Sequence, residues 1–157
     1  MGGTTSAIAS VLVLFIAAAA SAGERIEETG REAFATDVWE ALELGEGHSV
    51  AIWRGRGVAY SDNPDSPMHL AAIDCAGSFE FMPGGATRDS GHCTYTTTDG
   101  DKLFDRWWQE PGALMARYEW LGGTGKLSGA KGGGTYTVTQ LNESLLSVSY
   151  SGVLELP

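Results

Sequence analysis

Residues 75–109 read CAGSFEFMPGGATRDSGHCTYTTTDGDKLFDRWWQ, and two turn signals divide this stretch into three segments. The first turn is Met82-Pro83-Gly84-Gly85, and the second is Asp99-Gly100, a dipeptide typical of two-residue hairpin turns. The segments around them are rich in Thr, Tyr, Phe and Trp, residue types that favour strands. The stretch therefore predicts two consecutive antiparallel hairpins, the beginning of a meander.

The two cysteines of the chain, Cys75 and Cys93, lie at equal distances from Gly84 in the first turn. Residues placed symmetrically about a hairpin turn face each other across an antiparallel pair of strands. In an oxidising compartment this geometry predicts a cross-strand disulfide, worth about 3 kcal/mol for a loop of this length. A redox or metal-binding pair is the alternative, but the sequence has no C-x-x-C motif and no histidine cluster to complete a zinc site.

Further strand-like segments lie on both sides of these hairpins. They are residues 38–44, 48–53 and 56–60 upstream, and residues 113–121, 135–141 and 144–156 downstream. Short connections without helical crossovers favour an up-and-down sheet, and closing that sheet removes its exposed edges. We therefore expect an all-β protein of one domain, built as an antiparallel up-and-down β-barrel of about eight strands. A β-sandwich is the alternative, and it would need the long crossings of a Greek key.

The chain before the expected barrel divides into two parts. Residues 1–22 contain an apolar run, Ala7 to Ala20, and end in the small-x-small pattern Ala20-Ser21-Ala22, which predicts a signal peptide cleaved before Gly23. The run is shorter than the roughly 20 residues of a membrane span, and because no Lys or Arg precedes it, an uncleaved signal anchor is the alternative. We expect export to the periplasm or the cell exterior, a flexible N-terminal segment over residues 23–37 and the barrel over residues 38–157.

The charged residues comprise 10 Lys and Arg against 20 Asp and Glu, which gives a net charge of −10. A surface of this sign repels phosphate backbones and anionic lipids, so neither nucleic acids nor membrane surfaces are expected as partners. No motif indicates a cofactor. Asp99, Asp101 and Asp105 lack the spacing of a calcium-binding EF-hand loop, so we expect no metal site either.

Alternation along the two hairpins divides their residues between two faces of the sheet, provided that Asp99-Gly100 is a two-residue turn. The first face is mostly apolar and is expected to form the interior: Ile73, Cys75, Phe79, Cys93, Tyr95, Phe104, Arg106 and Trp108. The second face contains Asp74, Ala76, His92, Thr94, Leu103, Asp105 and Trp107. Asp74, His92 and Asp105 would be neighbours there, and a histidine flanked by carboxylates is suited to act as a general acid or base. A solvated outer face is the simpler interpretation of the same residues.

Aromatic residues are concentrated in the predicted strands. Rings gathered at one end of a barrel would form a flat, apolar pocket with a few hydrogen-bond donors, suited to a small hydrophobic ligand. The alternative is that the rings fill the core. The candidate ligand-binding residues are Trp53, Tyr95, Phe104, Trp108 and Trp120.

The segment Gly122 to Tyr136 reads GGTGKLSGAKGGGTY and imitates a nucleotide-binding loop. A P-loop needs a Gly five residues before its Gly-Lys pair and a Ser or Thr after it, and these places hold Trp120 and Leu127. The glycine spacing also differs from the dinucleotide-binding fingerprint, and strand-like sequence flanks the segment on both sides. The segment therefore does not indicate a nucleotide site.

The same segment resembles GGTGKF-x-x-A-x-G, the connection between late strands in the small barrels of the allene oxide cyclase and dirigent type. The resemblance covers mainly the second half of the chain. It implies a barrel that acts on hydrophobic small molecules, either by cyclising an unstable epoxide or by orienting phenoxy radicals. The catalytic residues of those families lie on early strands and loops, where this sequence has no matching motif, so no catalytic residue is carried over.

Three functions are compatible with the sequence. The leading one is an exported β-barrel protein that binds a small hydrophobic ligand. The first alternative is an isomerase or cyclase that acts on such a molecule in the barrel cavity. The second is a structural or interaction protein whose barrel is filled by its own side chains. The absence of a recognisable catalytic motif favours a binding protein over an enzyme.

Overall fold

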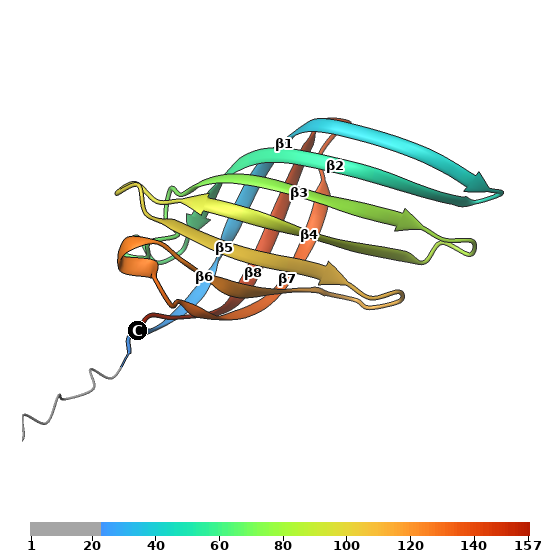
Figure 1. Cartoon of the computed structure of the whole chain (residues 1–157). Helices are drawn as coiled ribbons and strands as arrows, with labels where there is room; N and C mark the ends of the chain where they lie inside the picture. Colours follow the sequence, from blue (N-terminus) through green and yellow to red (C-terminus); the bar gives the residue numbers. More distant parts are fainter. Residues whose placement is uncertain (1–22) are drawn as a thin grey trace, which may run out of the picture.

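The computed structural model describes residues 23–157, which form eight antiparallel strands closed into one barrel (Figure 1). The strands pair in sequence order, and the last returns to pair with the first. They are β1 Arg25–Gly45, β2 His48–Ser61, β3 Ala72–Phe81, β4 Thr87–Thr96, β5 Lys102–Gln109, β6 Ala116–Gly123, β7 Lys131–Gln140 and β8 Leu145–Glu155, with a single 3-10 turn, η1 Gly125–Leu127, between β6 and β7. The predicted all-β, up-and-down barrel is confirmed. The predicted signal peptide, residues 1–22, lies outside the described residues.

The first strand corrects the expectation for residues 23–37. β1 begins at Arg25, pairs with β8 at once and pairs with β2 from Gly30 onward, so most of the segment expected to be flexible forms barrel wall. Its side chains alternate between interior and solvent, and the interior positions include Glu28, Glu32 and Phe34. A half-buried strand is recognised in a sequence by apolar residues at every second position. Because Glu28 and Glu32 occupy two of these positions, the sequence pattern did not indicate a strand here.

One end of the barrel is closed by the β2–β3 and β6–β7 loops, and the ends of the described chain lie there too (Figure 1). Met68 of the first loop and Leu127 of η1 are almost fully buried. The carboxylate of Glu28 ties the β2–β3 loop to β1, because it accepts hydrogen bonds from Ser61 Oγ at 2.9 Å and from Ser66 Oγ. This end therefore offers no passage to the interior.

The opposite end is open because some strands there continue beyond the point where their neighbour stops pairing with them. β1 pairs with β8 only as far as Ala35, and β7 pairs with β6 only as far as Tyr136, although β7 continues to Gln140. Past these points the β1–β2 and β3–β4 hairpins, and to a lesser extent β5–β6, extend beyond β7 and β8 (Figure 1). The wall is thus incomplete at this end, and the interior opens to solvent.

The β3–β4 hairpin has the predicted register. Cys75 pairs with Cys93, and their sulfur atoms form the predicted disulfide. Pro83, Gly84 and Gly85 make the turn, which Met82 closes by donating its N–H to the carbonyl of Ala86 at 2.8 Å. The disulfide therefore links two adjacent strands at inward positions of the barrel wall.

The register of β5 against β4 differs by one residue from the two-residue turn expected at Asp99-Gly100. Thr97 N donates to Asp101 O at 2.9 Å, so Thr98, Asp99 and Gly100 form a three-residue loop. Gly100 has φ of 89°, the left-handed conformation that such a loop requires at its last position. A shift of one residue moves every side chain of a strand to the other face. Asp105 and Trp107 consequently face the interior, whereas Phe104, Arg106 and Trp108 face outward.

Trp107 occupies the interior beside two glycines that face each other, Gly77 on β3 and Gly91 on β4. A Cβ atom at either position would overlap the indole ring. The two glycines therefore provide the space that lets a tryptophan lie flat against the wall of a narrow barrel. No helix among residues 23–157 has the length and apolar character needed to cross a membrane.

Candidate functional site

The barrel interior contains two connected chambers that lead inward from the open end. The outer chamber, called the vestibule below, has a volume of about 600 Å³ and includes Trp39, Phe81 and Gln140 in its lining. The inner chamber has a volume of about 70 Å³ and reaches down to Met68 at the closed end. Six residues line both chambers: Trp53, Phe79, Asp89, Tyr136, Val138 and Leu146. Together the chambers form a funnel that is wide outside, where aromatic and polar side chains are mixed, and narrow and aromatic inside.

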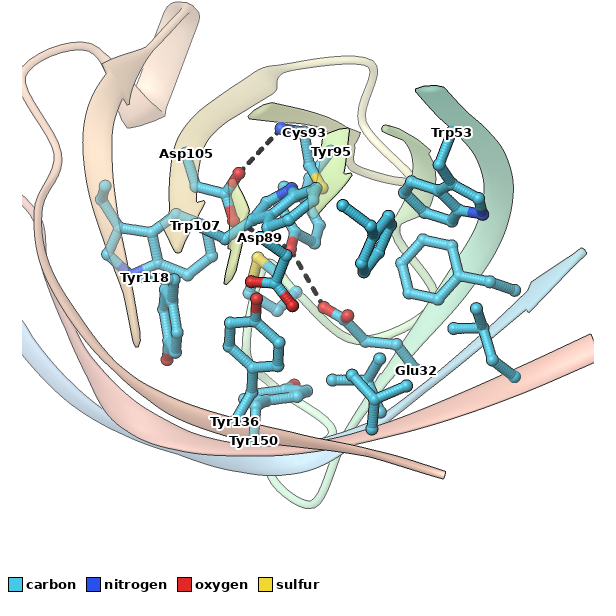
Figure 2. A pocket seen from close by; sticks show the side chains of 17 residues that line it. Glu32, Trp53, Asp89, Cys93, Tyr95, Asp105, Trp107, Tyr118, Tyr136 and Tyr150 are labelled. Atoms are coloured by element: carbon cyan, nitrogen blue, oxygen red, sulfur yellow. Dashed lines mark hydrogen bonds between the residues drawn. The ribbon is translucent and has the colours of Figure 1, made fainter. Parts of the chain in front are cut away.

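A chain of three polar side chains crosses the inner chamber. Tyr95 Oη lies 3.1 Å from Glu32 Oε1 and 3.2 Å from Asp105 Oδ2, and Cys93 N donates to Asp105 Oδ1 at 2.8 Å (Figure 2). The tyrosine hydroxyl has one proton and can donate it to only one of the two carboxyl groups. The second carboxyl group must therefore be protonated to hydrogen-bond to the same oxygen.

Burial decides which carboxyl group holds that proton. Desolvation, and secondarily the charge of Asp105, raises the pKa of Glu32 to about 8. Desolvation also raises the pKa of Asp105 to about 7, but the hydrogen bonds from Cys93 and Tyr95 oppose this increase by stabilising the carboxylate. Asp105 accepts hydrogen bonds from both Cys93 N and Tyr95 Oη, and Glu32 has Tyr95 alone, so we assign the proton of the pair to Glu32 and the negative charge, once one forms, to Asp105.

Asp89 is a third buried carboxyl group, located where the two chambers join. It accepts a hydrogen bond from the backbone N–H of Gln109, and desolvation raises its pKa to about 6. Its Oδ1 atom has no hydrogen-bond partner among the described residues, and the same is true of the buried Tyr118 hydroxyl. Buried polar atoms without partners are uncommon in folded proteins, and both atoms lie in a chamber that has room for another molecule.

The three predicted acid–base candidates are not brought together. Asp74 lies on the outer face, where it forms an ion pair with Arg54 at 3.0 Å. His92 also lies outside, and its Nδ1 is 3.0 Å from the backbone carbonyl oxygen of Asp105. Only the side chain of Asp105 enters the barrel, because of the register of β5 described above.

The five predicted ligand-binding aromatics also separate into two groups. Trp53, Tyr95 and Trp120 line the inner chamber. Phe104 and Trp108 are on the outer face of β5, where the guanidinium group of Arg106 lies 5.2 Å from the centre of the Trp108 ring. They do not line either chamber.

Sequence reasoning missed most of the polar lining. Glu32, Asp89, Tyr118 and Tyr136 were not selected as site residues, although all four line the inner chamber. One feature of the sequence does indicate Glu32. If residues 25–35 are treated as a strand, Glu28, Gly30, Glu32 and Phe34 lie on the same face of it, and Phe34 marks that face as the interior.

The glycine-rich segment has a structural role at the closed end. Lys126 N donates to Asp101 Oδ2 at 3.0 Å, and Lys126 Nζ donates to Asp99 Oδ2 at 2.7 Å. The two carboxylates therefore hold the β6–β7 loop against the β4–β5 hairpin. Within residues 23–157 there is no group of three or more His, Cys, Asp or Glu side chains arranged to hold a metal ion.

Comparison with protein-family models found no match, and comparison with curated protein sequences found none either. Solved structures with the same architecture do exist. The pterocarpan synthase dirigent protein GePTS1 aligns with a TM-score of 0.54 at 10% identity, over 93% of this chain and 97% of that one. The pterocarpan synthase dirigent protein PsPTS1 aligns with a TM-score of 0.52 at 10% identity, over 85% and 96%. At this identity the likeness concerns the fold alone, so this chain has a dirigent-like barrel.

Proposed function

We propose that the protein binds a small, largely apolar molecule that enters through the open end of the barrel and reaches the inner chamber. The observation that carries the proposal is the funnel itself, an aromatic chamber with partnerless polar atoms of Asp89 and Tyr118, open to a vestibule of about 600 Å³. Ligand pockets characteristically combine an apolar lining with a few placed polar groups.

The comparisons agree with this proposal at the level of fold, since the similar barrels are dirigent proteins with pterocarpan synthase activity in their names. We also propose that the protein works in an oxidising compartment, outside the cytoplasm. The disulfide between Cys75 and Cys93 supports this location, because such bonds persist mainly in exported proteins.

The test is titration with the neutral fluorescent probe N-phenylnaphthylamine, whose emission increases in apolar surroundings. Val138 lines both chambers, so Val138→Trp should block the passage and weaken probe binding by about tenfold or more, equivalent to about 1.4 kcal/mol. Leu121→Trp is the matched control, because Leu121 is half exposed on the outer face of β6. Equal affinity in both variants, or no binding to the unmodified protein, would contradict the proposal.

A second candidate function is acid–base catalysis of an isomerisation or cyclisation in the same cavity. It is favoured by the Glu32–Tyr95–Asp105 chain, in which a protonated acid and a carboxylate share one hydroxyl group. Such a pair can deliver a proton at one atom of a bound molecule and remove one at another. Deuterium exchange at the methyl group of 4-phenyl-2-butanone in D₂O, followed by NMR, tests this activity, because the carbonyl end of this ketone is narrow enough to enter the inner chamber while its ring stays in the vestibule. Tyr95→Phe should abolish the exchange and retain probe binding, whereas exchange no faster than in buffer alone would exclude the activity for this ketone.

A further inference from the structure

We propose that the molecule bound in the barrel is a hydrophobic amine, with its ammonium group in the inner chamber and its apolar body in the vestibule. This inference rests on the proposed binding function and adds the chemical class of the ligand.

The charge of the lining is the first support. The two chambers are lined by four acidic residues, Glu32, Asp89, Asp105 and, at the mouth, Glu143. Their lining contains no Lys, Arg or His. A carboxylate or phosphate ligand would find no positive charge there to compensate its own, and each ionised carboxyl group would repel it strongly in a region of low dielectric constant. A cationic ligand is the kind whose charge these carboxylates would neutralise.

The partnerless polar atoms are the second support. Asp89 is 7% exposed, and its Oδ1 accepts no hydrogen bond within the described part of the chain. The hydroxyl oxygen of Tyr118, which is also buried, is free to accept one. The carboxyl groups of Glu32, Asp89 and Asp105 enter the chamber from three different strands (Figure 2). An ammonium group carries three donors and no acceptor, so it matches a chamber that offers free acceptors.

The rings around the carboxyl groups are the third support. Trp53, Trp107, Trp120, Tyr118 and Tyr136 all line the inner chamber. Aromatic faces attract cations, and cages of such rings are a recurrent means of binding ammonium groups. The outer positive side chains do not compete for them, since Arg54, Arg56 and Arg106 lie on the opposite face of the sheet in ion pairs with Asp74, Asp37 and Glu119.

The sizes of the chambers set the shape of the ligand. At about 10 to 15 Å³ for each water-sized probe, an inner volume of about 70 Å³ admits an ammonium group and a short linker. An aromatic or alicyclic body does not fit there and must remain in the vestibule, against Trp39, Phe79 and Phe81. The ligand class is therefore a primary or secondary amine on a two- or three-atom linker.

The experiment is isothermal titration calorimetry with three ligands of nearly equal shape: phenethylamine, phenethyl alcohol and hydrocinnamate. At pH 8 we expect the amine to bind at least about tenfold more tightly than the alcohol, because a charged hydrogen bond to a buried carboxylate is worth about 1.5 to 3 kcal/mol. Hydrocinnamate should not bind measurably. Asp89→Asn should reduce the affinity for the amine about tenfold and that for the alcohol by a clearly smaller factor, because only the amine loses a charged hydrogen bond. Asp74→Asn, on the outer face, should change neither.

Titration across pH tests the proposal without any variant. The ionisable groups that face the inner chamber are the carboxyl groups of Glu32, Asp89 and Asp105 and the hydroxyl groups of Tyr95, Tyr118, Tyr136 and Tyr150. The phenol pKa values are raised by burial, so only the carboxyl groups gain charge between pH 5 and pH 8. Amine affinity should therefore increase across this range, whereas alcohol affinity should not.

The outcomes separate the two proposals. Equal affinity for amine and alcohol, or amine binding that does not change with pH, overturns the amine proposal and leaves the binding function intact. Failure of all three ligands, together with failure of N-phenylnaphthylamine, overturns the binding function itself.

Discussion

The stability of the barrel should decrease as pH increases from 5 to 8, and Glu32 should be a main cause. Below its ordinary pKa of 4.5 this group is protonated in both the folded and the unfolded chain, so its contribution to stability is complete. Between 4.5 and about 8 the folded protein holds a proton that the unfolded chain has lost, and unfolding becomes easier as pH rises. Above about 8 the contribution is gone.

The magnitude follows from the size of the pKa difference. One pKa unit corresponds to about 1.4 kcal/mol, so an increase from 4.5 to about 8 corresponds to about 5 kcal/mol. Entry of water on ionisation lowers this value, and we expect about 2 to 5 kcal/mol. The raised pKa values of Asp105 and Asp89 act in the same direction, with their effects ending near pH 7 and pH 6.

The perturbation is Glu32→Gln, which cannot ionise, with Glu40→Gln as control because Glu40 is exposed on the same strand. Urea denaturation followed by tryptophan fluorescence gives the free energy of unfolding at each pH. We expect Glu32→Gln to lose about 2 to 3.5 kcal/mol less than the unmodified protein between pH 5 and pH 8, because part of the full difference falls outside this range, and Glu40→Gln to lose the same amount as the unmodified protein. Parallel curves for Glu32→Gln and the unmodified protein would refute the reasoning, as would a stability that increases with pH.

Two further predictions concern the barrel wall. Replacing Cys75 and Cys93 together by Ser should lower the free energy of unfolding, measured by urea denaturation, by about 3 kcal/mol. A reductant should destabilise only the unmodified protein. A loss below about 1 kcal/mol would contradict this estimate. Gly91→Ala should lower the free energy of unfolding by about 1 to 3 kcal/mol and alter the near-UV circular dichroism spectrum, because the new Cβ atom would overlap the ring of Trp107. Ser90→Ala, on the outer face of the same strand, should leave the spectrum unchanged.

The fold was largely predictable because its strongest signals are local. Turn residues near Gly84 and the symmetric placement of Cys75 and Cys93 determine the register of the β3–β4 hairpin. The closure of the sheet follows from short connections repeated along the chain, whereas residues 48–53 and 56–60, expected as two strands, form the single strand β2.

The site was less predictable for two physical reasons. The dipeptide Asp99-Gly100 suits both a two-residue and a three-residue loop, and the choice between them decides whether Asp105 faces the interior or the solvent. In addition, Glu32 and Asp89 are charged residues at interior positions, where patterns of polarity predict apolar side chains. Both errors concern the barrel interior, where carboxyl groups occupy positions that usually hold apolar side chains.

Met68 and Leu127 are buried across the closed end, so the barrel interior can be reached from one end only. A ligand bound as we propose would therefore have to enter and leave through the same opening. The group that entered first would be the last to leave, so a second molecule could take its place only after the first had gone.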